Sequence, residues 1–155
     1  MTPRERATSD RRLRKLADFL DKLPRKRFNY LVWVGEDWKG APDLSCGTTA
    51  CAVGWATTIP AFRRLGLRLT AGLGSHGAGG GYAYNVNDAT SHEDAVKSVF
   101  LLTHAEARYL FLPNECSLFS GGPPSPGEDA TPKKVAAHIR RFVKDRAQYE
   151  AGATW

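Results

Sequence analysis

The sequence predicts a mainly α fold of the α+β class: a compact helical domain around a central helix of small residues, with one β-hairpin that carries a glycine-rich tip. Three observations predict it. Apolar residues recur at spacings of three and four, a nearly uncharged run of small residues spans positions 46–56, and two short alternating segments flank a glycine-rich stretch. The 155 residues, 42% of them hydrophobic, suffice for one buried core.

The first helix is expected over about residues 10–23. Ser9 or Asp10 can cap its start, and Pro24 ends it. Basic side chains occupy the faces that the apolar stripe leaves free. That stripe has the spacing of one helix face and consists of Leu13, Leu16, Ala17, Leu20 and Leu23.

Charge is unevenly placed along the chain. Residues 1–28 contain ten Lys or Arg and four Asp or Glu, whereas residues 29–155 contain twelve of each, so the whole excess of +6 lies in the first segment. We therefore divide the chain into a basic N-terminal helical arm (1–28) and a single globular domain (29–155). Such an arm is typical of proteins that meet a polyanion or an acidic protein face. The alternative is a solvated helix face that keeps the protein soluble.

An aromatic run at 28–34 is expected to form a short strand or an irregular packed segment, and a loop at 35–42 follows. This loop carries Trp38, which can stack on nucleic-acid bases or simply cover the core. The candidate partner-binding residues combine the basic arm with this tryptophan and one loop histidine. They are Arg11, Arg12, Arg14, Lys15, Arg25, Lys26, Arg27, Trp38 and His76.

The central helix is expected from about 46 to 58, with Ser45 or Asp43 as its cap. On a helix, Gly47, Ala50, Cys51 and Gly54 would share one face, against which another backbone could pack closely. A further short helix, capped by Thr58 and opened by Pro60, is expected through Arg64, and Gly66 closes it.

Residues 67–70 and 82–86 alternate like strands and are expected to form the β-hairpin. The stretch between them contains Gly72, Gly74 and Gly77, a formal G-x-G-x-x-G match. A dinucleotide site needs a helix at that point, and a strand candidate follows instead. The interpretation is a loop that becomes ordered on a partner, with His76 exposed at its tip.

Three helix starts follow the hairpin. Ser91 with Asp94 predicts one helix start, and Thr103 with Glu106 forms a capping box that predicts a second. After a Pro- and Gly-rich loop at 121–127, Thr131 and Pro132 open the last helix.

Cys46 is the candidate with reactive chemistry, because a helix N-terminus favours a thiolate. The Cys-Gly start of a small-residue helix resembles the active-site opening of papain-like and bacteriocin-processing cysteine peptidases. The resemblance implies a nucleophilic Cys46 and a histidine partner on a strand. Here His76 lies in the glycine-rich loop, His92 and His104 at predicted helix starts and His138 in a helix, and the glutamine of an oxyanion hole is missing before Cys46. The alternative is that Cys46 and Cys51 are small buried hydrophobes.

A second resemblance covers residues 20–145. The pattern Cys-Gly-Thr-x-x-Cys-x-x-Gly-Trp-Ala at 46–56, followed by Leu-Thr-His-Ala-Glu-Ala at 102–107 and a Thr-Pro start at 131–132, resembles small bacterial and phage proteins. It implies a shared fold and no particular activity. A phage or mobile-element role, such as inhibition of a host system, follows from that association alone.

These observations predict a small binding protein without a catalytic site, whose basic arm engages nucleic acid or an acidic protein surface. The alternative is a hydrolase or transferase that uses Cys46. No cofactor and no metal site are expected, and a homo-oligomer is left open. Three cysteines without metal spacing favour reduced thiols and a cytoplasmic setting. No apolar run approaches the roughly 20 residues that span a membrane, and no secretory signal is recognised.

Overall fold

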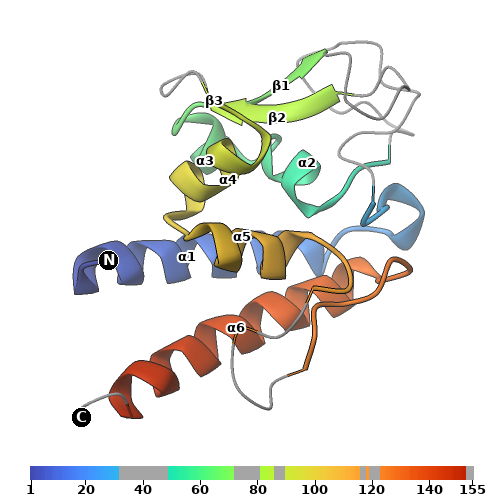
Figure 1. Cartoon of the computed structure of the whole chain (residues 1–155). Helices are drawn as coiled ribbons and strands as arrows, with labels where there is room; N and C mark the ends of the chain where they lie inside the picture. The colour runs from blue at the N-terminus through green and yellow to red at the C-terminus, as the bar shows by residue number, and fades with distance from the viewer. Residues whose placement is uncertain (32–48, 72–80, 86–89, 116–117, 119–122, 153–155) are drawn as a thin grey trace.

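The computed structural model describes residues 1–31, 49–71, 81–85, 90–115, 118 and 123–152. Helices dominate these residues and pack below a small sheet (Figure 1). The predicted mainly α class is confirmed, and so is the β-hairpin.

Helix α1 (Pro3–Leu20) begins earlier than the sequence predicted. Thr2 is its N-cap and forms a capping box with Glu5, and Pro3 occupies the first turn. Ser9, predicted as a cap, is instead fully buried within the helix. The predicted apolar stripe is confirmed, since Leu13, Leu16 and Leu20 are fully buried. The short 3₁₀ helix η1 (Arg25–Arg27) follows after Pro24.

Helix α6 (Pro132–Gly152) runs antiparallel to α1, so the start of α1 and the end of α6 lie on the same side (Figure 1). Its start agrees with the prediction, because the Thr131 hydroxyl accepts a hydrogen bond from the Lys134 amide at 3.1 Å. Ile139, Phe142 and Val143 are buried. The apolar faces of α1 and α6 therefore belong to one core.

The central helix is much shorter than predicted. Helix α2 (Ala52–Ala56) begins only after Cys51, whose Sγ accepts a hydrogen bond from the Gly54 amide at 3.5 Å. Ala50 is extended because its backbone pairs with Phe28 in a parallel bridge. Ala50 and Cys51 therefore do not share a helix face with Gly54, and Gly47 lies outside the described residues. All five residues of α2 are buried, as are Ala50 and Cys51, so the part of the small-residue segment from 50 to 56 lies inside the core.

Helix α3 (Pro60–Arg63) is capped by Ile59 rather than by Thr58, whose hydroxyl donates to the Trp55 carbonyl oxygen at 2.8 Å. Gly66, which follows, has a φ of 93°, a conformation that favours glycine. The prediction that glycine closes this segment is confirmed.

The hairpin consists of β1 (Leu67–Ala71) and β2 (Gly81–Asn85), paired antiparallel from Leu67 with Asn85 to Ala71 with Gly81. The glycine-rich tip at 72–80 lies outside the described residues. A third short strand, β3 (Thr90–Ser91), was not predicted and pairs with β2. It leads directly into α4 (His92–Phe100).

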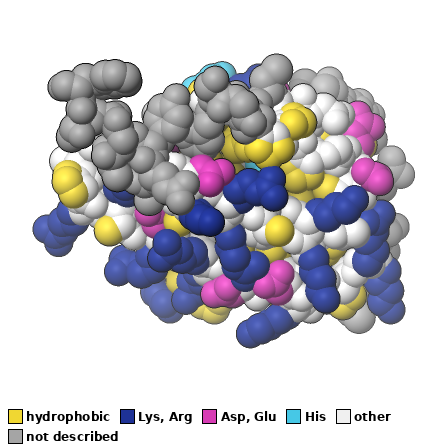
Figure 2. Space-filling view, turned by 90° about the horizontal axis from the view of Figure 1, so that it is seen from below, with side chains coloured by type: hydrophobic (Ala, Val, Ile, Leu, Met, Phe, Trp, Pro, Cys, Tyr) yellow, Lys and Arg dark blue, Asp and Glu magenta, His cyan; other side chains and the backbone are white. Residues whose placement is uncertain are grey.

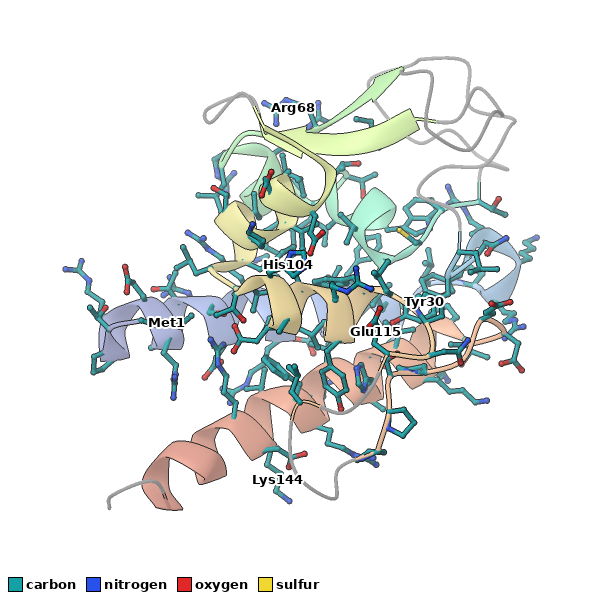
Figure 3. All side chains as sticks on the ribbon, in the orientation of Figure 1. Met1, Tyr30, Arg68, His104, Glu115 and Lys144 are labelled. Carbon is teal, nitrogen blue, oxygen red and sulfur yellow. The ribbon has the colours of Figure 1, made fainter. Side chains whose placement is uncertain are left out.

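Helix α5 (His104–Phe111) has the predicted capping box, since the Thr103 amide donates to Glu106 and the Glu106 amide donates to the Thr103 hydroxyl. The Tyr30 hydroxyl donates to the Leu110 carbonyl oxygen at 3.1 Å and so ties the segment after η1 to the end of α5 (Figure 3). Burial raises the pKa of Tyr30 far above its ordinary value.

Candidate polyanion-binding surface

The four acidic residues of the N-terminal segment all have partners. Glu5 is the N3 residue of the α1 capping box, and the hydrogen bond from the Thr2 amide lowers the pKa of Glu5. Asp18 and Asp21 both accept from Arg140 of α6, at 2.7 and 2.6 Å. Asp10 lies 3.7 Å from the buried Arg146. The negative charges of α1 are thus directed toward α6 or toward the helix start.

Three of the predicted basic residues remain exposed on α1: Arg11, Arg14 and Lys15. No ion pair among the described residues involves their side chains. Arg11 and Lys15 are one helical turn apart, so their charges lie on the same side of α1. Arg4 and Lys22 are exposed at the two ends of the same segment.

The other predicted basic residues divide into two groups. Arg12 is half-buried and donates to the Val99 carbonyl oxygen at the end of α4. Arg25 donates to the Asp129 carbonyl oxygen at 2.9 Å, and the Arg27 guanidinium lies 4.4 Å from the centre of the Trp55 ring. These three side chains fasten the N-terminal segment to the rest of the protein, whereas Lys26 is exposed.

A second helix, α6, is also basic, and its charge was not predicted. Residues 132–146 contain six Lys or Arg and one acidic residue, but the balance over residues 29–155 hid this concentration. Because one face of α6 is buried, most of its cations point outward, and Lys144 extends away from the body of the protein (Figure 3). The exposed cations of α6 are Lys133, Lys134, Arg141 and Lys144. A charge count in a window of one helix length would have found them.

Seen from below, the described part of the molecule carries many Lys and Arg side chains and fewer Asp and Glu side chains (Figure 2). We call the exposed cations of the two antiparallel helices the α1/α6 basic surface. It comprises Arg4, Arg11, Arg14, Lys15 and Lys22 of the α1 segment with Lys133, Lys134, Arg141 and Lys144 of α6.

The remaining candidates are not part of this surface. Trp38, His76 and Cys46 lie outside the described residues, so their roles stay predictions. Cys51 is buried, and desolvation raises its pKa to about 11. His138 is also buried, with its Nε2 3.0 Å from the Tyr109 carbonyl oxygen. Within the described part of the chain, no three His, Cys, Asp or Glu side chains gather as a metal site would require.

Comparison with known proteins found no match: no protein-family model, no curated protein and no solved structure matches the chain. Separately, none of the described helices combines the length and the apolar content needed to cross a membrane.

Proposed function

We propose that this chain is a binding protein that engages nucleic acid through the α1/α6 basic surface, in a cytoplasmic setting. The observation that supports this most strongly is the separation of charges on α1. Its acids are held by the helix start and by the arginines of α6, while exposed cations of both helices carry no ion pair among the described residues. Unpaired cations are the groups that neutralise backbone phosphates.

The rigidity of the two helices supports the same proposal. The apolar faces of α1 and α6 lie in the core, so the spacing of their outward cations is preset before a partner arrives. Pre-ordered donors lose less conformational entropy on binding than side chains of a disordered arm.

A nucleic acid fits this surface better than an acidic protein does. Protein interfaces usually contain a central apolar or aromatic cluster. Among the described residues the exposed large hydrophobic side chains are Met1 and Leu31. Met1 precedes α1 and Leu31 follows η1, so neither lies on the exposed faces of α1 or α6. A nucleic acid, whose backbone carries regularly spaced charges and little apolar surface, matches a surface of cations without an apolar centre. An acidic protein face, and with it inhibition of a host system, is the alternative outcome.

The test is fluorescence anisotropy with labelled single- and double-stranded DNA and RNA over a range of salt concentrations. The variant Arg141→Gln/Lys144→Gln removes two charges from α6 on the surface. The control Lys97→Gln/Arg108→Gln removes two charges from α4 and α5, where each cation has a carboxylate partner. We expect the α6 variant to flatten the slope of log K against log salt by about 0.9 per lost contact, and the control to change it much less.

Two results would overturn the proposal. One is the absence of binding by the wild-type protein at about 50 mM salt, where phosphate contacts are strong. The other is an equal loss of affinity in the α6 variant and in the control, since the effect would then depend on net charge and not on this surface. If an acidic protein is instead captured from lysate and only the α6 variant releases it, the surface recognises a protein.

A further inference from the structure

A cavity of about 280 Å³ lies between α1 and the end of α3. Three cationic residues of α1 line one side of it. The other side comes from α3 and the turn that follows. The lining residues are Arg11, Arg12, Lys15, Ala61, Phe62, Arg64 and Leu65, so four cations and three apolar residues surround the space and no acidic residue does.

The apolar side of the cavity is held by the core. Phe62 is fully buried, and its ring packs edge-on against Phe100 with 5.0 Å between the ring centres. Leu65 is partly buried against the same core. Because close-packed interiors give way little, this side is set before any ligand enters.

The cationic side is partly anchored. The Arg12 guanidinium donates a hydrogen bond to the Val99 carbonyl oxygen. Arg64 is the C-cap of α3 and is exposed. No ion pair among the described residues involves Arg11, Lys15 or Arg64.

The charges also repel one another. Burial, and after it the charge of Arg11, lowers the pKa of Arg12. Like charges that share a half-buried space destabilise each other, and a bound anion would relieve this repulsion.

We infer that this cavity binds a phosphate monoester, with its oxygens against the arginines and the carbon atoms of its carrier against the partly exposed Ala61 and Leu65. A monoester carries about −1.5 to −2 charges and three strong acceptor oxygens, which matches four surrounding cations better than the single charge of a diester does. The volume lies just below the roughly 300–1,000 Å³ of ordinary small-molecule pockets, so it holds a phosphate and part of its carrier.

The cavity shares Arg11 and Lys15 with the α1/α6 basic surface and adds Arg12 and Arg64. The inference goes beyond the proposed function, because that surface would follow diesters along a strand whereas the cavity takes one terminal group. The monoester has two sources, the phosphorylated end of a nucleic acid or a small phosphorylated molecule. Both present the same group to Arg12 and Arg64.

Two matched pairs of probes separate these sources. Calorimetry compares AMP with adenosine, with inorganic phosphate as a third titrant. Anisotropy compares two otherwise identical oligonucleotides, one with a 5′-phosphate and one with a 5′-hydroxyl. We expect the phosphorylated member of at least one pair to bind more tightly, by about tenfold or more, because charge-assisted hydrogen bonds are gained.

Arg64→Gln is the main variant, since Arg64 is exposed and its replacement leaves the core intact. Arg108→Gln is the control, because Arg108 is an exposed arginine of α5 that neither lines the cavity nor belongs to the α1/α6 basic surface. We expect Arg64→Gln to abolish the preference for the phosphorylated probe and Arg108→Gln to retain it. Arg12→Gln, with its folding checked by circular dichroism, should act like Arg64→Gln.

A preference for AMP alone supports a small-molecule site, and a preference for the phosphorylated oligonucleotide alone supports a strand-end site. The inference is overturned if neither pair shows a preference, or if Arg64→Gln retains the preference of the wild type. The proposed function is tested separately: it fails if the wild-type protein does not bind the 5′-hydroxyl oligonucleotide. That result does not depend on Arg64→Gln.

Discussion

Arg146 of α6 and Glu106 of α5 form an ion pair of 3.1 Å inside the protein, with only 6% and 16% of their side chains exposed. The same guanidinium donates to the Ser9 hydroxyl of α1 at 3.2 Å and lies over the Phe142 ring. One side chain thus links three helices that are far apart in sequence. Burial lowers the pKa of Arg146 and raises that of Asp10, so the charges are held at a desolvation cost.

We predict that Arg146→Met lowers the free energy of unfolding by about 3–5 kcal/mol, because Glu106 and Asp10 lose their buried cation. Urea denaturation followed by circular dichroism measures this. The control Lys144→Met, on the exposed face of the same helix, should change the free energy by less than about 0.5 kcal/mol. Equal effects of the two variants would contradict the prediction.

A second prediction concerns the carboxylates of the same cluster. Adding Glu106→Gln and Asp10→Asn to Arg146→Met should recover part of the lost stability, because no unpaired buried charge remains. Glutamine keeps the capping box with Thr103. A triple variant less stable than Arg146→Met alone would show that the carboxylates are not destabilised by the loss of Arg146.

The exposed pairs of Arg140 should behave differently. Asp18→Asn/Asp21→Asn removes both partners of Arg140, which is 40% exposed, and we expect a stability change below about 1 kcal/mol. The same variant should strengthen DNA binding, because two negative charges beside the α1/α6 basic surface are gone. Anisotropy at low salt measures this, and unchanged affinity would count against that surface.

His138 makes stability depend on pH. Desolvation lowers the pKa of His138 below its ordinary value. Below about pH 6.5 the unfolded chain therefore binds a proton that the folded chain does not, so stability is lost as pH falls from there toward the lowered pKa. We expect His138→Gln to reduce this loss, measured as melting temperature at about pH 7.5 and pH 5.5. An identical pH dependence in the variant would contradict it.

Cys51 should be unreactive in the folded protein. With a pKa of about 11, only about one thiol in ten thousand is a thiolate near pH 7, and the side chain is buried. In the variant Cys46→Ser/Cys116→Ser we expect iodoacetamide to leave Cys51 unmodified until denaturant is added, as mass spectrometry would show. Rapid native labelling would contradict the assigned burial.

The reciprocal variant tests the cysteine-enzyme alternative. With Cys51→Ala/Cys116→Ser, fast alkylation near neutral pH would support an activated Cys46, whereas slow alkylation would remove the main support for a nucleophile.

Local signals in the sequence predicted the elements that depend on neighbouring residues. The capping box of Thr103 and Glu106, the apolar stripe of α1 and the pairing of 67–70 with the segment after the glycines all follow from spacing alone. The Thr2–Glu5 capping box has the same local signature, and it places the start of α1 earlier than the predicted start near residue 10.

The mainly helical class, the hairpin and the basic character of α1 depend on contacts or charges within a few residues, so they could be predicted from the sequence. Three other features depend on contacts between distant parts of the chain and are seen only in the folded protein. Ala50 pairs with Phe28 and delays the start of α2, Arg140 and Arg146 take up the acids of α1, and Arg64 meets Arg12 across a cavity. Each joins residues 22 to 136 positions apart, and the periodicity of a single helix or strand carries no information about such distant partners.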